Sequence, residues 1–94
     1  MNWTTDKPDF DQVKGAHLAN RDLRYANARN AFLVKADLTG SDLRYADLSG
    51  ADLRRAVLTG ARLTGATLDG AKLDGAVTIG CECAGFGKAS IAKE

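Results

Sequence analysis

The chain has 94 residues and a mass of 9.9 kDa, which is enough for one domain and leaves no room for a separate substrate-binding lobe. Thirteen Lys and Arg against 12 Asp and Glu give a net charge of +1, which favours neither a strongly basic nucleic-acid binder nor a polyacidic surface. No stretch reaches the roughly 18 apolar residues that a membrane span needs, and the N-terminus carries no apolar signal segment. We therefore expect a soluble, cytoplasmic protein.

Residues 1–10 differ in pattern from everything that follows. They contain Trp3 and Phe10, and Pro8 interrupts any strand in this segment. The open ends of a repeated structure expose unpaired backbone groups, and atypical flanking segments usually cover them. We therefore expect residues 1–10 to form a short N-terminal cap.

Residues 11–80 repeat with a period of five. Every Leu of the chain occupies one position of the repeat, and Ala dominates the position two residues earlier. The unit is Ala-x-Leu-x-x, and fourteen such units fill residues 11–80. Self-similarity at a fixed period is typical of a repeat architecture. The Leu residues are Leu18, Leu23, Leu33, Leu38, Leu43, Leu48, Leu53, Leu58, Leu63, Leu68 and Leu73.

Neither an α-helix nor a flat strand brings these Leu side chains to one side. Five residues advance an α-helix by about 140° beyond a full turn, so successive Leu would spiral around it. Side chains alternate in a flat strand, so an odd spacing would send successive Leu to opposite faces. The pattern is satisfied when the chain bends once per unit and points each Leu and Ala inward. The repeat therefore predicts an all-β solenoid.

The last position of each unit is suited to a corner, because it is Gly in eight units and Asn in two. These residues tolerate positive φ at the lowest cost. The segment Arg21–Ala26 recurs, with one change, as Ser41–Ala46 twenty residues later. Four units per coil would stack these segments, and fourteen units would then give about 3.5 coils. Because Ala28 replaces a Leu and Arg21 replaces an Ala, we expect a loosened first coil with Arg21 turned outward.

The run Ala46–Arg55, which reads Ala-Asp-Leu-Ser-Gly-Ala-Asp-Leu-Arg-Arg, resembles the pentapeptide-repeat family. The resemblance covers about three quarters of the chain. It implies a right-handed quadrilateral β-helix with the Leu and Ala columns inside. It also implies a protein of bacterial type. It implies little about activity, because most members of the family have no known function.

Residues 81–94 follow the repeat and contain Phe86 and Ile91. We expect them to form a C-terminal cap or tail. Cys81 and Cys83 continue the two inward positions, which predicts small buried residues that finish the core. In a cytosolic protein two Cys are expected as reduced thiols, and a bridge between residues two apart in an extended strand has poor geometry. The alternative, a thiolate metal pair, needs further ligands.

Residues twenty apart share one outer face of the predicted coil, and two of the four faces are candidate contact surfaces. The third face carries stacked Tyr and Arg, which are over-represented among residues that dominate interface energies. The opposing interpretation is a solvated grid of Asp and Arg. The second face is nearly uncharged and would allow pairing with a second copy. The third face comprises Asp22, Arg24, Tyr25, Asp42, Arg44, Tyr45 and Arg62; the second comprises Thr39, Val57, Thr59, Val77 and Ile79.

Catalytic and metal sites are poorly supported. His17 is the only His, so no pair of imidazoles and no relay can be assembled. The first face carries an exposed apolar pair, Phe32 and Val34, beside a basic strip that consists of Lys35, Arg54, Arg55 and Lys72. So few phosphate contacts would give weak nucleic-acid binding, and we expect none.

We therefore expect a non-catalytic scaffold or interaction protein without cofactors, binding a protein partner or serving as a small subunit of an assembly. The alternative comes from the family resemblance: some members mimic duplex DNA and bind type II topoisomerases such as gyrase. This chain shows no continuous acidic stripe, which a DNA mimic would need.

Overall fold

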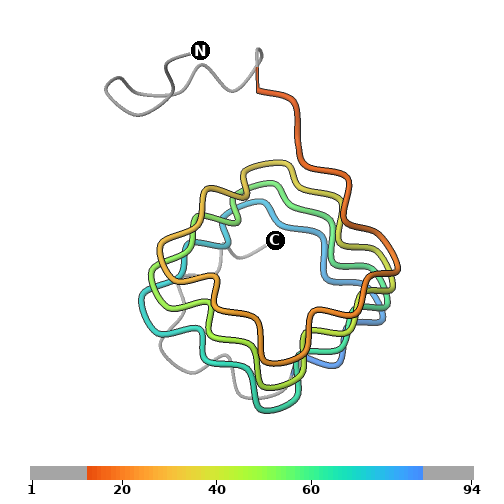
Figure 1. The fold of residues 1–94 in the computed structure, drawn as a ribbon. Helices are drawn as coiled ribbons and strands as arrows, with labels where there is room; N and C mark the ends of the chain where they lie inside the picture. The colour runs from red at the N-terminus through yellow and green to blue at the C-terminus, as the bar shows by residue number, and fades with distance from the viewer. Residues whose placement is uncertain (1–12, 84–94) are drawn as a thin grey trace.

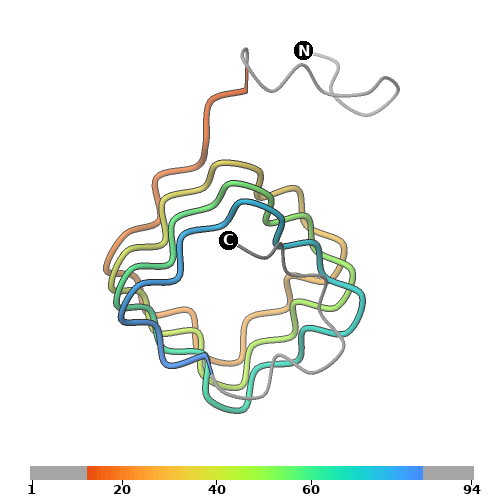
Figure 2. The same cartoon turned by 180° about the vertical axis from the view of Figure 1, so that it is seen from behind.

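The computed structural model describes residues 13–83, which wind into stacked four-sided coils (Figures 1 and 2). Within this range the β-structure consists of isolated parallel bridges, without helices or longer strands. Each bridge joins two residues that are twenty apart, so four units make one coil, as the sequence predicts. The bridges pair His17 with Asp37, Asp22 with Asp42, Asn27 with Asp47, Phe32 with Asp52, Asp37 with Val57, Asp42 with Arg62, Asp47 with Thr67, Asp52 with Lys72, Val57 with Val77 and Arg62 with Glu82.

Backbone hydrogen bonds hold each wall to the coils on both sides of it. The Asp42 N–H donates to the Arg21 carbonyl at 2.9 Å, and the Asp42 carbonyl accepts from the Leu23 N–H at 2.8 Å. The next residue, Leu43, donates in the other direction, to the Arg62 carbonyl at 2.7 Å. Because this pattern recurs from unit to unit, the walls satisfy their backbone groups without forming a conventional sheet.

The corners are β-turns that close every fifth residue. At one of them the Ala46 N–H donates to the Leu43 carbonyl at 3.0 Å, and Tyr45 between them has φ of 65°. Every fifth residue from Asn20 to Gly80 adopts positive φ, whether or not it is Gly. The predicted corner position is therefore confirmed along the whole described coil.

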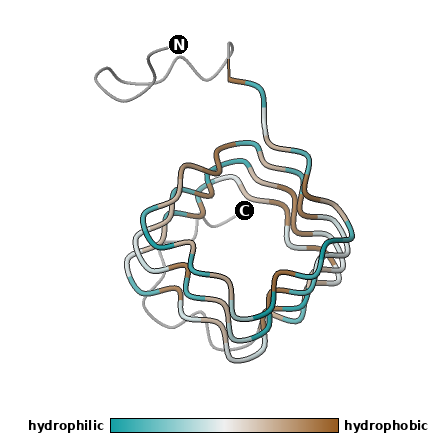
Figure 3. Cartoon of the chain, viewed as in Figure 1, coloured by the Kyte–Doolittle hydropathy of each residue, from teal (hydrophilic) through white to brown (hydrophobic). Residues whose placement is uncertain are grey.

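The core is a column of Leu and Ala side chains inside the coil. Leu48 and its equivalents from Leu38 to Leu73 are buried, and so are most Ala residues of the inner position. Along each wall the ribbon alternates between hydrophobic and hydrophilic positions (Figure 3). Burying one Leu side chain contributes about 1.5–3 kcal/mol, so this column dominates the stability of the fold.

The first coil is less regular than the others. Arg21 is exposed, as expected, and Ala28 is only partly buried. Ala16 occupies an inward position of the repeat yet is exposed, contrary to the expected inner column, because its unit opens the described coil. Ser41 stands in the Ala position one coil beyond Arg21 and is fully buried. Its hydroxyl donates to the Leu18 carbonyl and accepts from the Arg21 N–H.

The structure places Cys81 and Cys83 within the range of a disulfide, so the expectation of poor bridging geometry was wrong, whereas the expectation of two reduced thiols stays a prediction. Both residues pack against the core from the two inward positions, as predicted. Their Cα atoms are 5.2 Å apart, inside the range that a disulfide spans. In a flat strand, residues i and i+2 also point to the same side, but their Cα atoms lie farther apart. The bend of the coil brings the two Cα atoms closer together. The cap at 1–10 and the rest of the tail at 84–94 lie outside the described residues.

Candidate interaction surface

A pair of stacked tyrosines marks one corner of the coil. The rings of Tyr25 and Tyr45 lie 5.3 Å apart between centroids with an interplanar angle of 14°. The two residues are 74% and 53% exposed. The next residue of this corner column is Gly65, and a Cβ atom added there would lie 2.5 Å from Cδ1 of Tyr45. The Tyr45 ring therefore lies between the Tyr25 ring on one side and Gly65 on the other.

Both tyrosines hold a backbone conformation that glycine would adopt more easily. Tyr25 has φ of 63° and Tyr45 has φ of 65°, in the left-handed region. A side chain in this region costs about 1–2 kcal/mol per residue, and such costs concentrate at functional positions. The other bulky corner residues are Lys35 and Arg55, which lie two corners away from the tyrosines and therefore on the opposite corner of the coil.

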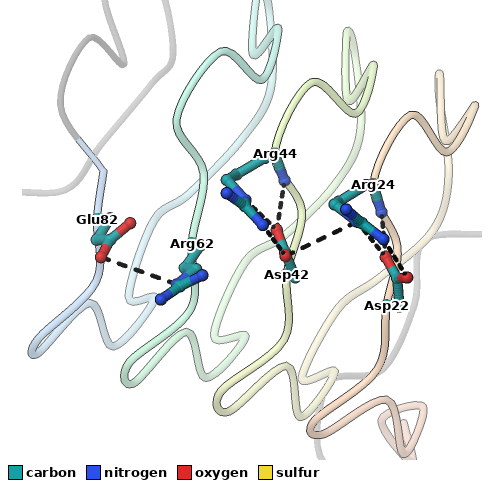
Figure 4. Close-up of polar contacts among 6 residues, drawn as sticks. All are labelled: Asp22, Arg24, Asp42, Arg44, Arg62 and Glu82. Carbon is teal, nitrogen blue, oxygen red and sulfur yellow. Dashed lines mark hydrogen bonds and ion pairs between the residues drawn. The ribbon is translucent and has the colours of Figure 1, made fainter.

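Asp and Arg side chains form a ladder along one wall of the coil (Figure 4). Each tyrosine follows directly after an arginine of this ladder in the sequence. Arg24 donates from Nε and Nη2 to the two oxygens of Asp22, both at 2.8 Å. Arg44 grips Asp42 in the same way, at 2.8 and 2.7 Å. The sequence places Asp and Arg on one face but leaves their pairing open, and the structure pairs them within each coil. Each guanidinium is thereby held in one orientation by two charge-assisted hydrogen bonds.

Weaker contacts connect these pairs along the axis. Nε of Arg24 lies 3.9 Å from Oδ2 of Asp42 in the next coil. Nε of Arg62 lies 3.9 Å from Oε2 of Glu82. Glu82 is not among the residues predicted for this face, although its place twenty residues after Arg62 is the sequence signal for it. Three arginines are therefore balanced by three carboxylates, and the ladder is close to neutral.

The pairing changes the acidity of the carboxylates. The hydrogen bond from the Arg24 side chain lowers the pKa of Asp22 from 3.8 to about 2. The hydrogen bond from the Arg44 side chain lowers the pKa of Asp42 to about 2 as well. Both groups are accordingly ionised at neutral pH, and neither is suited to general acid catalysis there.

The structure brings all seven residues predicted for the third face onto one wall and its adjoining corner. We call this surface the tyrosine face. It consists of Asp22, Arg24, Tyr25, Asp42, Arg44, Tyr45 and Arg62.

The second predicted face also forms one wall, and its polarity falls toward the C-terminal coil. Asp37, at its polar end, accepts a hydrogen bond from the Thr39 hydroxyl at 2.6 Å. Val57 bridges Val77 in the next coil, and Ile79 beside them is strongly exposed. The five predicted residues, Thr39, Val57, Thr59, Val77 and Ile79, therefore share one surface that ends in an apolar patch.

The basic strip differs from the sequence expectation at one position. Phe32 is exposed, but Val34 is only 2% exposed, so the predicted apolar pair does not form on this surface. The side chain of Val34 is shorter than that of Arg54, which occupies the same position one coil further along, and it projects less far from the wall. Arg54 itself grips Asp52 from Nε and Nη2, at 2.7 and 2.5 Å. Part of the positive charge of this strip is therefore neutralised on the same wall.

The structure of residues 13–83 also bears on metal binding and on membrane insertion. Across this range, no cluster of three or more His, Cys, Asp or Glu side chains has the arrangement that a metal ion needs. In the same range, no helix has the length and apolar character to traverse a bilayer.

The chain matches a known repeat family over more than half of its length. Residues 22–60 and 41–77 match the family described as pentapeptide repeats, with eight copies. The chain belongs to the pentapeptide-repeat family. Membership implies that the four-sided coil is a right-handed quadrilateral β-helix.

One solved structure of a pentapeptide-repeat protein agrees with this assignment. This chain is 35% identical to Rfr23, a pentapeptide repeat protein from the cyanobacterium Cyanothece 51142, with a TM-score of 0.62 over 83% of this chain. The match spans 54% of that protein, so this chain corresponds to about half of its length. A pentapeptide repeat protein from the thylakoid lumen of Arabidopsis thaliana is 25% identical over 92% of this chain and 72% of its own, but its TM-score of 0.30 is too low for a structural argument. No curated protein sequence matches this chain.

Proposed function

We propose that this pentapeptide-repeat protein is a non-catalytic interaction module that binds a protein partner through the tyrosine face. The observation that carries the proposal is the exposed stack of Tyr25 and Tyr45 in left-handed backbone conformations. Glycine would relieve that strain, and it fills the corner position in the C-terminal coils. A strained, exposed aromatic pair is better explained by a contact that it makes than by the stability of the coil.

The length of about 3.5 coils and the cytoplasmic location expected from the sequence remain predictions.

The tyrosine face is preorganised for binding. The Tyr45 ring is enclosed between Tyr25 and Gly65, and the guanidinium groups of Arg24 and Arg44 are each fixed by a carboxylate. Immobilising a flexible side chain on binding costs about 0.5–1.5 kcal/mol, and side chains that are already ordered avoid most of that cost. Tyrosine and arginine in such positions are the residue types that dominate binding energy at protein interfaces. This arrangement favours high-affinity binding through a small contact area.

The charges of the tyrosine face indicate the chemistry of the partner. The three arginines of the face each have a carboxylate beside them once Glu82 on the same wall is counted, so this wall presents no net charge to attract a polyanion. Binding should therefore depend weakly on ionic strength, unlike binding to nucleic acid, which weakens steeply with salt. A near-neutral protein surface with an aromatic or aliphatic centre fits this pattern best.

The test compares two glycine variants that remove equivalent strained side chains from opposite corners. One is Tyr25→Gly with Tyr45→Gly, and the matched control is Lys35→Gly with Arg55→Gly. We expect proteins captured reproducibly by the wild-type chain to be captured by the control variant and lost with the tyrosine variant. Equal capture by both variants, with both folded by circular dichroism, would overturn the proposal.

Two other roles follow from the sequence but have weaker support. Pairing of two copies through Thr39, Val57, Thr59, Val77 and Ile79 would be read from the oligomeric state in solution. Modulation of a type II topoisomerase by DNA mimicry would need unpaired carboxylates, whereas Asp22, Asp42 and Asp52 each pair with an arginine. A supercoiling assay with gyrase separates that role from a scaffold, which should have no effect.

A further inference from the structure

The last bridge of the described coil fixes the backbone around two cysteines. Glu82 stands between Cys81 and Cys83 and forms a parallel bridge with Arg62. The Glu82 N–H donates to the Ala61 carbonyl at 2.8 Å, and its carbonyl accepts from the Leu63 N–H at 2.9 Å. The neighbouring coil therefore holds this segment in place, whether or not the two sulfur atoms are bonded.

This backbone presents the two cysteine side chains to each other. Cys81 occupies the inward Ala position and Cys83 the inward Leu position, and both pack against the core. Their Cα atoms are 5.2 Å apart, a spacing that a disulfide spans without backbone movement. Both residues are only partly buried, which leaves part of each residue accessible to a small reagent. Proximity, orientation and access are thus supplied by the fold.

We propose that Cys81 and Cys83 form a reversible thiol–disulfide site at the C-terminal end of the coil, which exchanges electrons with low-molecular-weight disulfides and thiols. The inference does not depend on the proposed function of the tyrosine face. In the oxidising direction, one cysteine thiolate attacks a sulfur of the small disulfide, forms a mixed disulfide and releases one small thiol. The second cysteine thiolate then attacks the protein sulfur of the mixed disulfide and releases the second small thiol. Two protein thiols are thereby oxidised, and one small disulfide is reduced to two thiols.

A role as a structural crosslink fits this pair less well. The stabilisation that a disulfide provides grows with the number of residues in the loop that it closes. Cys81 and Cys83 are two residues apart, and the bridge of Glu82 to Arg62 already restrains that loop. Opening and closing the bond should therefore leave the coil folded, which is what a reversible site needs.

The test uses the full chain with glutathione disulfide and dithiothreitol as probes. After each treatment the protein is alkylated with iodoacetamide under non-denaturing and then denaturing conditions, and its intact mass is measured. We expect two alkyl groups on the reduced protein, none after glutathione disulfide, no retained glutathione, and a single-chain mass in both states. Retained glutathione, two alkylatable thiols after oxidation, or a covalent dimer would overturn the proposal.

The single variants Cys81→Ser and Cys83→Ser provide matched controls. Each keeps one attacking thiol and lacks the second, so each should stop at the mixed disulfide and retain one glutathione. Circular dichroism of the wild-type chain in both states shows whether the coil survives the exchange. An unfolding of the chain on reduction would show that the bond is a structural crosslink and would also overturn the proposal.

Discussion

The hydroxyl oxygen of Ser41 accepts a hydrogen bond from the Arg21 backbone N–H at 3.1 Å, across two neighbouring coils. The same hydroxyl donates to the Leu18 carbonyl. In other turns the backbone closes directly, as when the Ala26 N–H donates to the Leu23 carbonyl at 3.1 Å. At the turn that ends in Arg21, the Ser41 hydroxyl is inserted between the donor and the acceptor. One buried side chain thus completes the turn in which an arginine replaces the usual alanine.

Replacing Ser41 with alanine should destabilise the chain by about 1 kcal/mol, because the Arg21 N–H and the Leu18 carbonyl lose their shared partner. Denaturant unfolding followed by circular dichroism measures this free energy. Adding Arg21→Ala should recover part of the loss, since an alanine at this position lets the turn close directly as elsewhere. A Ser41→Ala variant as stable as the wild type would show that the hydroxyl bridge contributes nothing.

The leucine column should tolerate neither loss of volume nor charge. Leu48 is buried with coils on both sides, so Leu48→Ala should cost about 2–5 kcal/mol. Because single domains have only about 5–15 kcal/mol of stability, Leu48→Asp should abolish the cooperative thermal transition. An exposed outward residue supplies the control, and Thr64→Asp should melt nearly as the wild type does. A cooperative transition in Leu48→Asp would contradict the inward position of the leucines.

Two glycine substitutions separate backbone strain from the enclosure of Tyr45. Gly60 has φ of 69° and open space around an added Cβ, so Gly60→Ala should cost only the left-handed strain of about 1–2 kcal/mol. Gly65→Ala adds a contact with Tyr45 and should cost more. Thermal unfolding of both variants gives the difference, and Tyr45→Gly in the Gly65→Ala chain should remove it. Equal losses in the two variants would mean that the Tyr45 ring does not rest on Gly65.

Acid should weaken the fold through the aspartates that pair with arginine. The pKa values of Asp22 and Asp42 are lowered from 3.8 to about 2 in the folded chain, mainly by the side-chain hydrogen bonds from Arg24 and Arg44. The unfolded chain therefore takes up protons first as the pH falls, and the free energy of unfolding decreases between about pH 4 and pH 2.

Urea unfolding across this pH range tests the effect of the two carboxylates. The double variant Asp22→Asn with Asp42→Asn should show a shallower decrease than the wild type. Other aspartates with lowered pKa values, such as Asp37 and Asp52, should keep part of the slope in the double variant. Identical slopes in the two chains would show that the bidentate pairs do not contribute.

The sequence predicts the coil well because one physical constraint repeats every five residues. The inward leucines, the corners and the twenty-residue coil follow from spacing alone, and so does the stacking of Tyr25 on Tyr45. Spacing does not predict two local features of the coil. One is the Ser41 hydroxyl that bridges a turn, and the other is the burial of Val34 at an outward position. The close approach of Cys81 and Cys83 was also not predicted, because the chain bends between two positions that lie farther apart in a flat strand. The identity of a partner is not encoded in the repeat at all.

Site-specific photo-crosslinking tests the proposed contact surface most directly. The photoreactive residue p-benzoylphenylalanine replaces Tyr45 in one chain and Arg55 in another, so that both probes occupy left-handed corner positions on opposite sides of the coil. We predict that illumination in native extract joins one reproducible protein to the Tyr45 probe and does not join it to the Arg55 probe. Crosslinking of the same protein from Arg55 alone, or from both positions equally, would contradict the assignment of the tyrosine face.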